Sequence, residues 1–220
     1  MRLDFDRPVD CADGAFGELA DVIIDPGRRS VTHVVVQPRE RHDLGRLVPI
    51  ARVRAGPGIA DRVALTLTDG QLNELEPLHD TEYIRLGERP SDPRWDVGVE
   101  AISQMPLSGS LGVNALGPGT EPTAFDPHAT LSFDRIPKGT VEIRRASDVV
   151  SADGHRIGNV IGVVIDEGDG IAELITEHGH LWRKREIAIP NASIDRIESD
   201  EVILAVSYDL VVALARGERG

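Results

Sequence analysis

Short apolar runs, each ended by turn-forming residues, follow one another along much of the chain. Residues 19–24 and 160–165 are rich in β-branched and aliphatic side chains, and each run lies between an Asp-Gly pair and an Asp-Pro-Gly or Asp-Glu-Gly turn. Residues 31–36 and 171–176 form a second pair of such runs. This pattern is typical of strands joined by tight turns, and it predicts an all-β protein.

The same order of residues occurs twice, about 140 positions apart. The sequence ADGAFGELADVIIDPG begins at Ala12, and ADGHRIGNVIGVVIDEG begins at Ala152. One residue is inserted before the second glycine of the later copy, and the Asp, Gly, Val and Ile positions then coincide. Leu3 also matches Ile143, so the match begins close to the start of each copy. A repeat this long predicts two copies of one small fold.

The repeat extends to the end of each copy. Further matching strands are predicted over 47–50 and 187–190, and over 63–67 and 202–206. Thr68 and Ser207 then stand where they can cap a short helix, over 69–75 and 208–215. We therefore predict two small antiparallel β-barrels of five to six strands, each closed by a short helix, because closure leaves few strand edges open.

Between the copies, residues 77–134 have a different composition. Eight of the 14 prolines lie between Pro77 and Pro137, and glycines cluster in the same region. We predict a domain over 1–76, a linker over 77–134 that is extended or partly disordered, and a second domain over 135–216. The alternative is an irregular strap packed on one barrel, whose candidate anchors are Tyr83, Ile84, Trp95 and Val97.

Composition narrows the classes of partner. Aromatic residues make up 4% of the chain against 40% hydrophobic residues, so the cores are expected to be aliphatic. The net charge is −13, from 37 acidic and 24 basic residues, which disfavours direct binding to nucleic acid or to an anionic membrane. The apolar run over 202–214 is too short to cross a bilayer, and the first residues lack the apolar core of a signal peptide. We expect no membrane insertion and a cytoplasmic location.

The loop over 177–186 is the strongest candidate for a binding site. It gathers basic and aromatic side chains in an otherwise acidic protein, namely His178, His180, Trp182, Arg183, Lys184 and Arg185. Trp and Arg anchor protein interfaces because they bury large areas and keep a polar handle. The alternatives are that Trp182 folds back as a lid on the barrel while the bases pair with nearby acids, or that the loop binds a small ligand.

Other chemistry-bearing residues favour structural roles. His178 and His180 have a spacing that could serve a metal, but further ligands are missing, so we predict no metal site. Asp13, Asp25, Asp153 and Asp166 each stand in a Gly- or Pro-containing turn, where an Asp side chain caps the backbone locally. Cys11, the only cysteine, is expected to be a small buried filler. With no nucleophile motif and no phosphate-binding pattern, we predict a protein that is not an enzyme and has no cofactor.

The strand motif Asp-Gly-x(1–2)-[Ile/Phe]-Gly-x-[Leu/Val], followed by a Val-Ile-Asp turn and by an Ile-Pro pair before a Val-rich last strand, resembles the PRC-barrel family. The resemblance covers roughly 1–76 and 135–214 and is closest in the second copy, at Ser151–Gly154 and Ile189–Pro190. It implies small β-barrels that act as interaction modules without a shared catalytic motif. Family members include the cytoplasmic domain of one component of the photosynthetic reaction centre and the C-terminal domain of a ribosome-maturation factor.

The function predicted from these features is a non-enzymatic adaptor that binds a protein partner. The resemblance implies two alternatives: an accessory factor in RNA processing or ribosome assembly, and a peripheral subunit of a photosynthetic or electron-transport complex. We expect the two barrels to pack on each other as a pseudo-dimer, because one barrel of this size has a thin core. Pairing between two chains in a homodimer is the alternative arrangement.

Overall fold

The computed structural model describes residues 1–39, 44–55, 62–85, 88, 92–104, 128–179 and 185–215. Most of this part of the chain is β-strand, and its two α-helices, α1 (Asp69–Asn73) and α2 (Tyr208–Ala215), are short. The predicted class is confirmed as a mainly β fold. The second helix has its predicted bounds, whereas the helix predicted over 69–75 ends at Asn73. No helix among the described residues is long and apolar enough to span a membrane.

The first copy forms one sheet, in which the strands are ordered β5-β4-β3-β2-β7-β6. β2 and β7 run parallel, and the other neighbours in this order are antiparallel. A 3-10 helix, η2 (Ile50–Arg52), follows Pro49. The strands are β2 (Pro8–Cys11), β3 (Gly14–Asp25), β4 (Ser30–Gln37), β5 (Arg46–Pro49), β6 (Val53–Ala55) and β7 (Val63–Leu65).

The second copy repeats this order strand for strand, as β15-β14-β13-β12-β17-β16. Here β12 and β17 are the parallel pair, and η4 (Asn191–Ser193) follows Pro190 as η2 follows Pro49. The repeat seen in the sequence is thus also a repeat of strand order. The strands are β12 (Asp148–Val150), β13 (Arg156–Ile165), β14 (Ile171–His178), β15 (Arg185–Pro190), β16 (Ile194–Glu198) and β17 (Glu201–Leu204).

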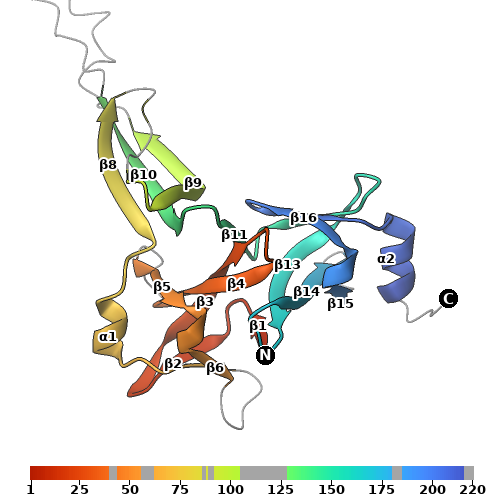
Figure 1. The fold of residues 1–220 in the computed structure, drawn as a ribbon, viewed down its shortest axis with the longest axis horizontal. Coiled ribbons are helices and arrows are strands. Elements are labelled where there is room, and N and C mark those ends of the chain that lie inside the picture. Colours follow the sequence, from red (N-terminus) through yellow and green to blue (C-terminus); the bar gives the residue numbers. More distant parts are fainter. Residues whose placement is uncertain are drawn as a thin grey trace, which may run out of the picture.

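Each copy gives its first strand to the sheet of the other copy. β1 (Arg2–Asp4) pairs with β13 of the second copy, with Leu3 opposite Val163. β11 (Val141–Arg144) pairs with β3 of the first copy, with Ile143 opposite Val22. The N-terminus therefore lies between the two halves (Figure 1). Because β3 and β13 are longer than the strands that their own copies place beside them, each exchanged strand completes an edge that would otherwise be open.

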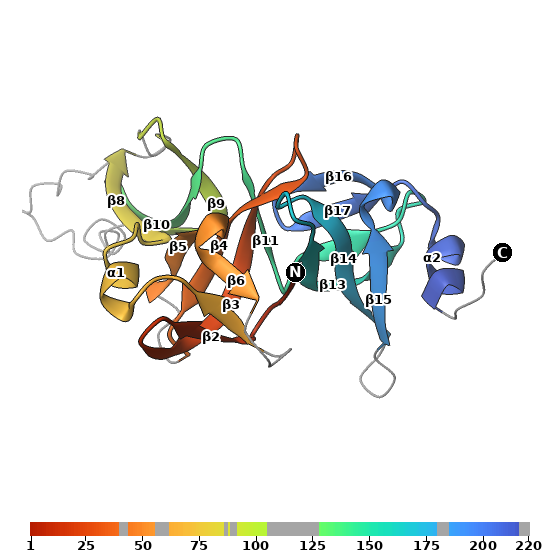
Figure 2. The ribbon, with the colours of Figure 1, turned by 60° about the horizontal axis from the view of Figure 1, so that its bottom comes forward.

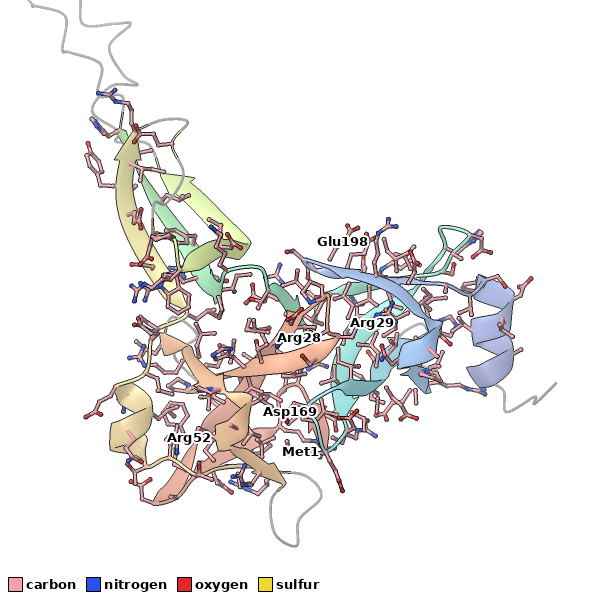
Figure 3. All side chains as sticks on the ribbon, viewed as in Figure 1. Met1, Arg28, Arg29, Arg52, Asp169 and Glu198 are labelled. Carbon is pink, nitrogen blue, oxygen red and sulfur yellow. The ribbon has the colours of Figure 1, made fainter. Side chains whose placement is uncertain are left out.

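The tips of two equivalent hairpins also meet at this junction. The Val31 amide donates to the Asp169 carbonyl, and the Ile171 amide donates to the Arg29 carbonyl, each at 2.9 Å. Arg29 and Asp169 both have positive φ angles, of 51° and 62°. The Arg29 guanidinium also donates to the carbonyl of Asp195 at 2.8 Å. Figure 3 shows Arg29 and Asp169 at the centre of the molecule. The junction is thus nearly symmetric in its backbone bonds.

One continuous hydrophobic core runs through both halves. It includes Leu3, Val22 and Leu65 from the first copy and Ile143, Val163 and other buried residues from the second. These side chains are aliphatic, as the composition predicts. The two copies therefore pack on each other, as expected. In addition, each copy contributes one strand to the sheet of the other copy.

Two equivalent glycines allow strands to approach closely. A Cβ atom on Gly17 would lie 2.0 Å from the carbonyl oxygen of Gln37, and one on Gly158 would lie 1.9 Å from that of Glu177. Real Cβ atoms do not come this close to backbone atoms, so both positions require glycine. This close approach gives a physical reason for the repeated glycine in the two copies.

Part of the region predicted as a linker forms a sheet of its own. β8 (His79–Arg85), β10 (His128–Pro137) and β9 (Trp95–Gln104) pair in that order, all antiparallel. The expectation of a region without regular structure is therefore wrong at both ends of 77–134, whereas 105–127 lies outside the described residues. Figures 1 and 2 show this curved sheet beside the first half. Alternating apolar residues on β10, among them Ala129 and Phe133, supply its buried face.

The three-stranded sheet is fixed to the first half by a second apolar cluster. Leu78 and Ile136 pack against the outward-facing Ile23, Val35 and Leu47, and the cluster also touches Trp95. The first copy is thus buried on both faces of its sheet. Trp95 is an anchor, as the strap alternative predicted, but it stands on a regular strand.

Candidate functional site

The structure places the two ends of the predicted binding loop. His178 ends β14 and Arg185 begins β15, and the two residues are opposite each other in the sheet. Arg185 is exposed. His180, Trp182, Arg183 and Lys184 lie outside the described residues, so the binding role of this loop stays a prediction.

His178 is held in place by the fold. Its Nδ1 atom lies 2.6 Å from the carbonyl oxygen of Ile157, to which it donates. Its ring also meets the ring of Tyr208, on α2, edge-on at 6.0 Å between centroids. These contacts tie β13, β14 and α2 together, so His178 supports the base of the loop. Among the described residues, no group of three or more His, Cys, Asp or Glu could hold a metal ion.

Within the described residues, the outer edge of β15, next to this loop, has fewer backbone partners than its counterpart in the first copy. In the first copy, the edge of β5 is occupied by the chain that follows α1: Leu47 N donates to Glu76 O at 3.2 Å, and Leu78 N donates to Gly45 O at 2.9 Å. In the second copy, β15 pairs only with β14 within the described part of the chain. An edge strand presents backbone N–H and C=O groups that can pair with another chain.

The turn aspartates cap the backbone, as their positions predict. Asp25 accepts from the amides of Gly27 and Arg28, and Asp166 accepts from those of Gly168 and Gly170. The equivalent pair Asp13 and Asp153 cap the starts of the two helices, accepting from Asp69 N at 2.9 Å and Tyr208 N at 3.0 Å. These carboxylates thus have structural partners, which leaves them poorly suited to acid–base chemistry.

Cys11 has the properties of a buried filler. Its side chain is in the core of the first half. Burial, with the nearby carboxylates of Asp13, Asp69 and Asp10, raises the pKa of its thiol to about 11. A thiol is nucleophilic as the thiolate, so this environment suppresses its reactivity.

We expect Cys11 to resist alkylation in the folded protein. With a pKa of about 11, on the order of one thiol in a thousand is ionised at pH 8, and the core shields it. Iodoacetamide should modify the native chain far more slowly than the chain unfolded in guanidinium, as followed by intact mass spectrometry. The assignment is direct because the sequence has one cysteine. Equal rates in the two states would contradict the buried position.

A cavity of about 560 Å³ lies on the three-stranded sheet. Its lining is a set of apolar and acidic residues with one arginine: Trp95, Val97, Leu131, Phe133, Glu82, Glu88, Asp92, Asp96 and Arg135. The central strand β10 supplies Leu131, Phe133 and Arg135, and β8 and β9 supply Glu82 and Val97 from either side. Sequence reasoning missed this cavity, although two of the candidate strap anchors, Trp95 and Val97, line it.

Cation–π contacts hold Trp95 at this cavity. The guanidinium of Arg135 lies 5.0 Å from the centre of its ring and that of Arg94 lies 5.9 Å away. Arg94 is paired with Asp92 at 2.7 Å, and this hydrogen-bonded pair lowers the pKa of Asp92 to about 2. The indole Nε1 atom is buried and has no hydrogen-bond partner in the described chain, which is an unfavourable state for a donor.

A second hollow, of about 410 Å³, lies where the halves meet, and its charges are paired. Arg145 forms an ion pair with Asp6, and Arg144 forms one with Asp200 at 3.3 Å. His79 lies 3.3 Å from Asp134. The arginine pairs join the end of β11 to Asp6 and Asp200, and the His79–Asp134 pair joins β8 to β10, so the hollow has a structural explanation.

Comparison with known proteins identifies one domain. Residues 145–211 match the family model of the PRC-barrel domain, and the match runs from just before β12 into α2. No curated protein matches the chain. The PRC-barrel domain is a generic protein-interaction or assembly domain. The segment 145–211 is therefore similar to a PRC-barrel domain.

Proposed function

We propose that the protein is a non-enzymatic interaction or adaptor protein, in which two PRC-like barrels present a surface to a protein partner. The match over residues 145–211 supports this assignment for the second copy. The first copy is included because its sheet has the same strand order, its glycine at 17 makes the same close approach as Gly158, and its first strand completes the second sheet.

The observation that carries the proposal is the difference between the two sheet edges. In the first copy, residues 76–78 occupy the edge of β5, whereas the matching edge of β15 has no strand partner among the described residues. β15 begins at Arg185, so this edge continues directly from the loop over 177–186. A partner that adds an extended segment to the edge would gain backbone hydrogen bonds, and side chains of the loop would supply selectivity.

The partner is expected at one copy only. The loop of the first copy at the corresponding position, residues 39–46, has no tryptophan, and its sheet edge is already occupied. The two copies thus divide their roles: the first supports the three-stranded sheet, and the second contacts the partner.

The proposal is tested by capture from a lysate of the protein's own host. Tagged full-length protein is compared with a Trp182→Ala/Arg183→Ala variant and with Arg39→Ala, a matched change in the loop of the first copy. We expect the native chain and Arg39→Ala to capture the same partner. The amount captured by the double variant should be lower by about tenfold or more, as for the loss of an interface anchor. Quantitative mass spectrometry measures the retained amount.

Two outcomes would redirect the proposal. If all three chains capture the same proteins in equal amounts, the loop does not form the contact surface. If nuclease treatment of the lysate abolishes the capture, the RNA-linked alternative replaces the adaptor.

A further inference from the structure

We propose that the cavity on the three-stranded sheet binds a segment of a protein in which a basic side chain is next to an apolar one. This site is separate from the edge of β15. The inference depends on the proposed function only in that the ligand is a protein. The cavity is defined by the residues that line it, on β8, β9, β10 and the chain before β9.

The apolar part of the cavity is held in place by contacts within the chain. Arg135, which covers the ring of Trp95, is itself held by Glu76 at 2.8 Å and Asp80 at 3.1 Å. Phe133 is buried, and Trp95 also touches the apolar cluster that joins this sheet to the first half. A fixed aromatic surface costs little ordering when an apolar side chain packs on it.

The charge around this surface is negative. Four of the nine lining residues are acidic and one is basic. The charge of Asp92 is balanced by Arg94, and that of Arg135 is balanced by Glu76 and Asp80.

The other three acidic residues, Glu82, Glu88 and Asp96, have no ion-pair partner within the described part of the chain. Glu88 accepts from the Arg85 amide and Asp96 accepts from the Gly139 amide, bonds that position a carboxylate without neutralising it. The side chain of Glu82 makes no hydrogen bond or ion pair within the described part of the chain.

These features together select the ligand. Carboxylates around an apolar surface attract a cation and repel nucleic acid, whose phosphates are negative. The volume of about 560 Å³ accommodates a few side chains. A lysine or arginine beside a leucine-like residue satisfies both the charge and the apolar surface, because its own stem is apolar as well.

The test is a fluorescence titration of the purified full-length chain. Trp182→Phe leaves Trp95 as the single tryptophan, because the sequence has two. The probe is the peptide acetyl-Lys-Leu-Lys-Leu-Lys-amide, and the matched peptide has Glu in place of each Lys. We expect the Trp95 emission to change saturably with the lysine peptide and not with the glutamate peptide. Binding of the lysine peptide should weaken about fivefold between about 20 mM and about 200 mM salt.

Charge variants locate the site. In the same background, Glu82→Gln should weaken binding about threefold, as expected for one exposed ion pair. Glu167→Gln is the control, since it removes the same charge from an exposed turn between β13 and β14, and it should leave the titration unchanged. No emission change with the lysine peptide, equal binding of the glutamate peptide, or equal effects of the two variants would overturn the inference.

The result is independent of the lysate experiment. A normal titration with failed partner capture would count against the adaptor role and leave the cavity site standing. A failed titration with normal capture would remove the cavity site alone.

Discussion

Replacing Gly158 with alanine is expected to destabilise the protein by at least about 3 kcal/mol, at the upper end of what overpacking costs. The added Cβ atom would lie 1.9 Å from the carbonyl oxygen of Glu177 and 2.9 Å from its carbonyl carbon. Both atoms belong to the backbone of β14, which is paired with β13 at this point through Asn159 and Glu177. The clash can be relieved only by separating the two strands, so ladder hydrogen bonds are lost as well.

Urea unfolding followed by circular dichroism measures this loss. Gly168→Ala is the matched control in the same half, because its Cβ would meet only the Asp166 side chain, at an ordinary contact distance of 3.4 Å. We expect the control to change stability by less than about 1 kcal/mol. Similar midpoints for the two variants would show that β13 and β14 do not approach each other as described.

Replacing Leu3 with aspartate is expected to damage the second half of the molecule, although Leu3 belongs to the first copy. Its side chain is fully buried, at 0% exposure, in the core that both halves share. Its strand completes the edge of β13. A carboxylate at this position would be buried without a partner, which costs several kcal/mol, or would force β1 out of the sheet.

Hydrogen exchange resolves which half is affected. In Leu3→Asp, amides of β13 and β14 should lose protection together with those of the first copy. The control Arg2→Ala changes the same short strand but removes only partly exposed ion pairs, with Asp4 and Glu186, and should cost less than about 1 kcal/mol. Retained protection in β13 and β14 of the Leu3→Asp variant would contradict the exchange of first strands.

The sequence predicted individual elements better than their partners. Thr68 caps α1 through a complete capping box with Gln71, and α2 begins at the predicted residue, because caps and turns depend on neighbours in the chain. The repeat also aligns Leu3 with Ile143. The repeat does not determine whether the strands at Leu3 and Ile143 pair within their own copies or with the other copy. Both arrangements place the same side chains in equivalent surroundings.

The region between the copies shows a different limit. Its prolines and glycines suggested a linker, although Ala129, Leu131 and Phe133 alternate with polar residues as in a strand. The cavity could not be predicted, because residues as far apart as Glu82 and Arg135 line it and only strand pairing brings them together. His178 was weighed as a metal ligand from its spacing, whereas a carbonyl and an aromatic ring from other elements fix its position.

The exchange of first strands also means that each of these strands is synthesised long before or long after its partner. β1 leaves the ribosome well before its partner β13, which ends at Ile165, so at typical translation rates β1 waits roughly ten to thirty seconds. During that interval the edge of β3 at Asp21–Ile24 also lacks its partner β11. A neighbouring nascent chain could supply the missing strand and yield intertwined dimers. High expression at elevated temperature should therefore enrich such dimers, and low expression, which keeps nascent chains apart, should favour the monomer.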